Sequence, residues 1–376
     1  MTSIGQLSRA RLAGRPADYA ALGLGRAVAV WEDGFRTAPG GPGTWEWWYF
    51  EARLDDGSTL VIVFYTKDFT EGGAGPPRPF VTLELDRPDG TRVSERATAH
   101  SGDHDFATGR CAVRIGASTF TGDHRGYRVH AELDGVTADV VLTPRTEPWR
   151  PETGHIYFGE DDERFFAWLP SVPSGSAEVT LAVGGRAERR AGTGYHDHNW
   201  GDTPVTGLID HWYWARAAAG PYNVIASHIT SEERYDRAEF PIFMLARGNR
   251  IVADDCTLVR FATYDEDDDP GTGRPVAGTL VFEYRAADPG DDGYRVTFTR
   301  EDTTPGAPRA ADLGELDEIG GFRNALAKIA GFDGSYLRFT GEVQIERMHG
   351  GQPAETHTAA ALWELVYPGR TPGSIS

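Results

Sequence analysis

The stretch GTWEWWYFEARLDDGST, residues 43–59, holds three tryptophans, a tyrosine and a phenylalanine within six positions and then reaches an Asp-Gly pair. Aromatic residues favour strands, and Asp-Gly favours the tight turn of a β-hairpin. The overlapping segment STLVIVFYTKDF, residues 58–69, alternates in the same way. Together the two segments predict an antiparallel hairpin that is apolar on both faces.

A two-residue turn at Asp56-Gly57 fixes the predicted register, in which paired residue numbers sum to 113. One face of the hairpin then holds a row of rings that ends in a carboxylate beside an ammonium group: Trp48, Phe50, Tyr65, Glu46 and Lys67. This arrangement is typical of a pocket for a large apolar ligand with one polar end. We therefore expect these rings to contact substrate and the two charged groups to be catalytic. An ordinary core capped by a surface ion pair is the alternative.

Strand-like alternation continues along the chain and breaks at Asp-Gly and Gly-Gly pairs. Four further segments of the first half show it: 78–96, 111–118, 127–144 and 177–189. The second half repeats the pattern, and the one convincing helix is short, at residues 321–332. We predict an all-β protein with a few short helices and two barrel-like or sandwich-like domains, residues 1–190 and 191–376.

The composition narrows the class of protein. The 376 residues carry a formal net charge of -19, which argues against binding to nucleic acid or to anionic membranes. No apolar run is long enough to span a bilayer, and the start shows no secretory signal. Cys111 and Cys256 are far apart, which argues against a disulfide framework. We expect a soluble cytoplasmic protein, monomeric or homodimeric, with a small-molecule partner.

A second dense stretch is GTGYHDHNWGDTPVTGLIDHWYWARA, residues 192–217. On a strand, His196, His198 and Trp200 share one face, while Asp197 and its alternate neighbours share the other. Three interpretations stay open. The histidines could hold zinc together with His211 or His228; they could tie an inter-domain connection together; or a catalytic histidine could lie beside a tryptophan wall.

In the adjoining IDHWYWARA, Trp212 and Trp214 share one side and fit either a core or a pocket wall. The chain lacks a G-x-S-x-G elbow, a Walker loop, a complete G-x-G-x-x-G and a C-x-x-C. We therefore expect no nucleotide, flavin or nicotinamide cofactor, and no metal.

The segments EWWYFEARLDDGSTLVIVFY, GTGYHDHNWG and WYWARA resemble the lipocalin-related family of carotenoid 1,2-hydratases, AttH-like proteins and decalin-forming cyclases of polyketide pathways. The resemblance spans residues 40–370 loosely and is specific in these motifs. It implies two lipocalin-like antiparallel β-barrel domains, a hydrophobic pocket and no cofactor. A His-x-Trp pair is functional in the hydratases, and it matches His198 and Trp200 here.

The hydratases also use a tyrosine and an aspartate on a later strand. The segment YNVIASHIT, residues 222–230, offers Tyr222, Ser227 and His228 but no aspartate, which disfavours hydration of an isolated alkene. A [4+2] cycloaddition needs no proton transfer, only a folded polyene and a hydrogen bond that polarises a carbonyl.

We therefore predict a cofactor-independent cyclase of polyketide-type metabolism, acting on a linear polyene by cycloaddition or rearrangement. Its expected catalytic residues are His198, Lys67 and Glu46. Its expected substrate contacts are Trp48, Tyr65, Phe50, Trp200, Trp212, Trp214, Tyr222 and His228. A hydratase or isomerase of terpenoid alkenes, and a non-catalytic binder of apolar ligands, are the alternatives.

Overall fold

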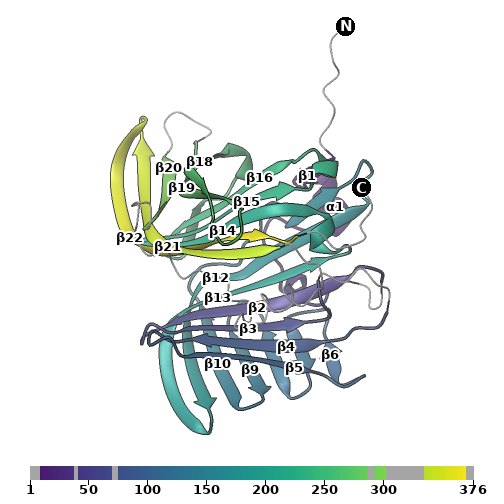
Figure 1. Ribbon diagram of the computed structural model, residues 1–376. Coiled ribbons are helices and arrows are strands. Elements are labelled where there is room, and N and C mark those ends of the chain that lie inside the picture. The colour runs from purple at the N-terminus through teal and green to yellow at the C-terminus, as the bar shows by residue number, and fades with distance from the viewer. Residues whose placement is uncertain (1–8, 38–40, 70–74, 287–291, 302–333, 370–376) are drawn as a thin grey trace.

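The computed structural model describes residues 9–37, 41–69, 75–286, 292–301 and 334–369. Within these ranges most residues lie in antiparallel strands, arranged in two sheets that lie one above the other in Figure 1. The predicted all-β class is therefore confirmed. The predicted helix at 321–332 lies outside the described residues.

The first sheet has 13 strands and curls into a half barrel, drawn in purple to teal in Figure 1. Its main path runs in the order β5-β4-β3-β2-β13-β12-β10-β9-β8-β7-β6, while β1 pairs with β11, and β11 with β12. The strands are β1 Ala10–Leu12, β2 Trp45–Leu54, β3 Thr59–Tyr65, β4 Phe80–Asp86, β5 Arg92–Thr98, β6 His104–Phe106, β7 Ala112–Ile115, β8 Ser118–Gly122, β9 Tyr127–Leu133, β10 Val136–Pro144, β11 His155–Phe158, β12 Arg164–Val183 and β13 Arg186–Gly201.

The second sheet has nine strands in the order β17-β16-β15-β14-β22-β21-β20-β19-β18. They are β14 Ile209–Ala219, β15 Tyr222–Ser231, β16 Glu239–Arg247, β17 Arg250–Ala253, β18 Val259–Asp268, β19 Pro275–Tyr284, β20 Gly293–Arg300, β21 Ser335–His349 and β22 Gln352–Tyr367. The described helical segments are short: α1 Pro16–Leu22, η1 Val30–Asp33, η2 Val205–Gly207, η3 Glu233–Tyr235 and η4 Cys256–Leu258.

The hairpin of β2 and β3 forms, but the predicted register is wrong by one residue. Trp48 lies opposite Phe64 and Trp47 opposite Tyr65, so paired numbers sum to 112. A shift of one residue moves every side chain of β3 to the other face of the sheet. Tyr65 therefore shares a face with Trp47, not with Trp48 as the sequence had suggested.

The turn explains the shift. It has three residues between Leu54 and Ser58, whose backbone N–H and C=O groups bond at 2.8 Å. The backbone N–H of Asp55 instead donates to Ala191 of the neighbouring β13, at 2.8 Å. Gly57 closes the turn at φ 86°, a left-handed conformation that glycine adopts without strain.

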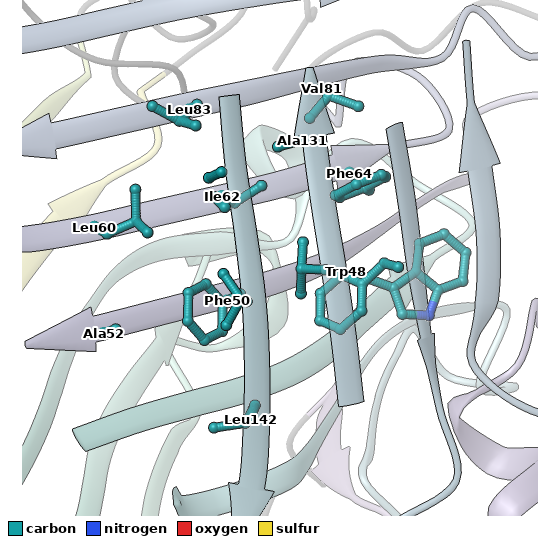
Figure 2. Packing of buried hydrophobic residues seen from close by; sticks show 14 of the residues in the cluster. Trp48, Phe50, Ala52, Leu60, Ile62, Phe64, Val81, Leu83, Ala131 and Leu142 are labelled. Atoms are coloured by element: carbon teal, nitrogen blue, oxygen red, sulfur yellow. The ribbon is translucent and has the colours of Figure 1, made fainter. Parts of the chain in front are cut away.

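Three large apolar clusters and one small cluster pack within and between the sheets. The first fills the half barrel and includes Trp48, Phe50 and Phe64, which point to the same side in Figure 2. The second belongs to the nine-stranded sheet. The third draws residues from both sheets, among them Trp47 of β2 and Ile229 of β15. The two sheets are therefore joined by a shared core.

The division between the sheets differs from the predicted boundary. Residue 190 falls within β13, which pairs along its length with β12 in the first sheet. The chain passes from one sheet to the other between Gly201 and Ile209. The division into two domains, residues 1–190 and 191–376, stays a prediction.

The two cysteines are both free and buried. Cys111 belongs to the cluster inside the half barrel, and Cys256 belongs to the cluster between the sheets. Burial raises the pKa of both thiols, that of Cys256 to about 12. Among the described residues, no helix has the length and apolarity needed to cross a membrane.

Candidate functional site

A cavity of about 130 Å³ lies between the two sheets. Its walls are mainly rings contributed by β2, β3 and β12 below and by β14 above: Trp47, Tyr49, Tyr65, Trp168, Trp212 and Trp214. Ligand pockets of drug size usually measure about 300–1,000 Å³. A large substrate must therefore displace side chains here or lie partly outside the cavity.

Strand alternation decides which residues reach the cavity. On β2, Trp47 and Tyr49 line it, while Trp48 and Phe50 point into the half barrel. On β13, Asp197 and Asn199 line it. The inter-sheet cavity thus uses the hairpin face opposite to the one that the sequence favoured.

Three of the predicted substrate-contacting residues do line the cavity: Tyr65, Trp212 and Trp214. They come from both sheets, so the structure brings together residues that are about 150 positions apart in the sequence. Tyr65 packs on Phe80 with ring centroids 4.4 Å apart. Trp214 packs edge-on against Tyr195 at 5.6 Å.

The other predicted contacts lie elsewhere. Trp48 and Phe50 belong to the core of the half barrel. Trp200 packs in a small cluster with Ala167 and Leu169. Tyr222 lies in the core of the second sheet, and its hydroxyl donates to Glu355 at 3.0 Å. His228 stacks on Phe261 at 4.0 Å, and burial lowers the pKa of its imidazole to about 4.

Two of the predicted catalytic residues meet, but away from the cavity. His198 Nε2 lies 2.9 Å from Glu46 Oε2, with both side chains fully buried. Glu46 also accepts hydrogen bonds from the backbone N–H groups of Arg36 and Thr37. The ring of His198 stacks on Trp48 at 4.5 Å. This pair therefore anchors the segment after η1 to the inner face of the first sheet.

Lys67 does not face Glu46 across the hairpin, because the register differs. Thr66 occupies that position, and its backbone N–H donates to the Glu46 carbonyl at 2.9 Å. The Lys67 ammonium group donates to the carbonyl oxygen of Gly41 at 3.1 Å. The predicted side-by-side arrangement on one strand face is wrong.

His196 lies in a second buried network on the same side of β13. Its Nδ1 is 2.9 Å from the carbonyl oxygen of Tyr49, and its Nε2 is 3.2 Å from Asp33 Oδ2. The Tyr127 hydroxyl donates to the same carboxylate oxygen at 2.7 Å. Burial lowers the pKa of His196, but the adjacent Asp33 outweighs this and the net pKa is raised.

These contacts bear on the proposed zinc ligands. His211 and His228 lie on β14 and β15 of the other sheet. Among the described residues, the acidic, histidine and cysteine side chains close enough to share an ion do not include His198, His211 or His228. The zinc set that was one of the three open interpretations is therefore not assembled among these residues.

Asp197 lines the cavity but is not among the site residues that the sequence predicted. Its Oδ2 accepts hydrogen bonds from the Tyr195 hydroxyl at 2.7 Å and the Trp168 indole at 2.9 Å. Its Oδ1 accepts from the Asn199 amide at 2.8 Å. Burial raises the pKa of Asp197 to about 6, although these donors oppose the rise.

Two ion pairs lie beside the cavity. The Arg216 guanidinium donates to Glu51 at 2.8 Å, and that of Arg338 donates to Glu364 at 2.8 Å. Burial raises the pKa of Glu51, but Arg216 outweighs it and the net pKa is lowered. The cavity therefore combines a tryptophan-rich wall with a charged edge. Strand alternation assigns Tyr49 to one face of β2 and Asp197 to one face of β13. The sequence near each residue does not show that these two faces lie together and line the cavity.

The fold and this cavity define an all-β protein with an aromatic pocket between two antiparallel sheets. The chain belongs to the Diels-Alderase-like family, whose model matches residues 41–303. It is 25% identical over 274 residues to a quinolone epoxide rearrangement protein, asqO, from Emericella nidulans, covering 69% of this chain and 73% of that protein. It is 28% identical over 219 residues to the Diels-Alderase poxQ of Penicillium oxalicum, covering 55% of this chain and 48% of that protein.

Among solved structures, the fold matches that of CghA with Sch210972 at a TM-score of 0.56. The identity is 14%, and the match covers 93% of this chain and 97% of that one. This similarity shows the two-sheet fold that the sequence motifs had suggested. The chain spans about half the length of the poxQ relative.

Proposed function

We propose that this protein is a cofactor-independent cyclase or rearrangement enzyme of specialised metabolism. It acts on an apolar, unsaturated small molecule held between the two sheets. The observation that carries the proposal is the cavity lined by Trp47, Trp168, Trp212 and Trp214, drawn from both sheets. Membership of the Diels-Alderase-like family supports it.

The physical reason is conformational. A linear polyene has many conformers, and a cycloaddition or rearrangement passes through few of them. A wall of flat rings favours folded, stacked conformers, and preorganisation of this kind lowers the barrier by several kcal/mol. Polar and charged side chains that also line the cavity, among them Asp197, Asn199 and Arg338, are available to orient one end of the substrate.

The predicted site residues have different proposed roles, because only some of them line the cavity. Tyr65, Trp212 and Trp214 line the cavity and are proposed as substrate contacts. His198 and Glu46 are proposed to shape the wall from behind, through the strands that carry them. A cytoplasmic location and a monomeric or homodimeric state stay predictions.

The test uses purified protein and a linear triene that carries a conjugated carbonyl group, with EDTA and no nucleotide. We expect cyclised product to form faster than in buffer. Val61→Trp, which fills the cavity, should abolish the acceleration, while Arg128→Trp on an exposed position of β9 should keep it. An equal rate in buffer would refute the proposal. In water labelled with heavy oxygen, incorporation of the label into the product would indicate hydration instead.

A further inference from the structure

Asp197 differs in its charge partners from two other carboxylates that line the cavity, Asp86 and Glu364. Glu51 pairs with Arg216, Glu364 with Arg338 at 2.8 Å each, and Asp86 with Arg92 at 2.6 Å. In the described part of the chain, no arginine or lysine forms an ion pair with Asp197, although its side chain is only 7% exposed. A buried carboxylate without a counter-ion is costly, so a proton on it is favoured.

The hydrogen bonds around Asp197 show where that proton can reside. Oδ2 already accepts from two donors, the Tyr195 hydroxyl and the Trp168 indole. Oδ1 accepts only from the Asn199 amide. A carboxylate oxygen has two lone pairs, so Oδ1 retains one for a proton. The arrangement holds the carboxyl group still and leaves one edge of it free.

The groups around Asp197 allow its carboxyl group to be neutral before proton transfer and stabilise the carboxylate that remains afterwards. Tyr49 lies opposite Asp197 across the β2–β13 pairing. Arg216 stands 5.0 Å from the ring of Tyr195, and its charge is already matched by Glu51. On the other face of β13, His196 and His198 stabilise the carboxylate at longer range. After the proton leaves, the three donors stabilise the anion.

We propose that Asp197 is the general acid of the cavity, and that the substrate presents to its Oδ1 an oxygen that accepts a proton or hydrogen bond, as in an epoxide or a conjugated ketone. This inference rests on the proposed function and deepens it, because it adds a substrate class and a catalytic residue. Asp197 lies on β13. The later segment in which the resemblance led us to look for an aspartate, residues 222–230, belongs to β15 and contains none.

For an epoxide the step balances without any further reactant. The Asp197 proton passes to the epoxide oxygen, and the adjacent carbon–oxygen bond breaks with its electron pair remaining on oxygen. A neighbouring group migrates with its electron pair to the cationic carbon. The hydroxyl proton then returns to the carboxylate as the carbonyl forms, so the product is an isomer of the substrate. For a conjugated ketone, the acid donates a hydrogen bond that polarises the alkene.

Two probes test the proposal separately. The first is trans-chalcone, whose carbonyl stretch is measured by infrared difference spectroscopy in the bound state. We expect a downshift in the wild-type protein that Asp197→Asn reduces. The second is trans-stilbene oxide, whose isomerisation to a carbonyl compound is followed over pH. The rate should fall as pH rises through about 6, and Asp197→Asn should lose at least about a hundredfold.

Two further variants provide a second test of the role of Asp197 and a control. Tyr195→Phe removes one donor to the carboxylate and should move the midpoint of the rate profile to higher pH, and it serves as the test if Asp197→Asn fails to fold. Asp139→Asn makes the same chemical change on a largely exposed side chain and should alter neither probe.

The outcomes separate this inference from the proposed function. An unshifted chalcone carbonyl overturns the role of Asp197, and so does an enzymatic acceleration of stilbene oxide isomerisation that Asp197→Asn leaves within about threefold of wild type. A shifted chalcone band without any cyclisation of the triene or isomerisation of stilbene oxide supports the hydrogen bond and refutes the proposed enzyme function.

Discussion

At the scale of single residues, the buried polar groups divide by the face of β13 on which they lie. His196 and His198 point into the half barrel, where Asp33 and Glu46 meet them. Asp197, between them in sequence, points into the cavity. Neighbouring residues of one strand therefore have different surroundings, with anchoring contacts on the inner face and the cavity on the other.

The first prediction concerns Glu46, which accepts hydrogen bonds from two backbone N–H groups and lies against His198. Glu46→Ala should lower the free energy of unfolding by about 3–5 kcal/mol, because it leaves buried donors without acceptors. Glu46→Gln keeps one acceptor oxygen and should cost less. Denaturant unfolding measures both, and equal losses would contradict this assignment.

A second prediction follows from the protonation of Asp197. Its folded pKa of about 6 lies above the usual 3.8, so the folded state binds more protons than the unfolded state between these values. Stability should therefore fall as pH rises from about 4 to 6, by up to about 3 kcal/mol. Asp197→Asn removes this dependence, because an amide does not titrate. The Asn199 side chain must then turn its oxygen toward the new amide N–H. Thermal unfolding at pH 4 and pH 8 compares the two proteins, and an unchanged pH dependence in the variant would count against it.

At the scale of elements, the turn after β2 fixes which rings reach the cavity. Its third residue, Gly57, has φ 86°, and an added Cβ would lie 3.0 Å from Pro88 Cγ. Gly57→Ala should therefore cost about 1 kcal/mol of stability. Gly126→Ala is the matched control, because its Cβ would meet only Leu142 O at 3.6 Å and its φ is not positive. Urea unfolding compares them, and equal stabilities would refute the assignment.

The same hairpin shows how far the sequence could be read. Alternation placed the strands at the right residues, because period-2 patterning is a local signal. Register was lost to one turn residue, Asp55, whose N–H bonds to Ala191 on a strand more than a hundred residues later. A long-range contact of this kind has no signature in the hairpin itself. The error paired Tyr65 with Trp48 instead of Trp47; Tyr65 lines the cavity on the opposite face, and its contact with substrate stays a prediction.

At the scale of the whole molecule, the shared cluster joins the two sheets. It contains Trp47 and Tyr65 from the first and Ile225, Ile229 and Met244 from the second. Which strand faces meet across this interface is set by packing of complete sheets, so sequence patterns could identify two apolar faces of β2 but not the one that the second sheet covers.

This interface predicts how the protein unfolds. Calorimetry should show one cooperative transition, since separating the sheets would expose the shared cluster to water. Ile225→Ala, in the second sheet, should lower the temperature of that single transition as a whole. Two transitions, of which the variant moves only one, would show that the halves are independently stable domains.

The two buried thiols allow local opening of the structure to be measured at two separate places. Alkylation requires an exposed thiolate, and both Cys111 and Cys256 lack one in the folded state. Each thiol should react with iodoacetamide only when its surroundings open, so mass spectrometry of timed samples would report the half barrel and the inter-sheet seam separately. A ligand bound between the sheets should slow the labelling of Cys256 more than that of Cys111. The two labelling rates would then show which part of the protein opens transiently.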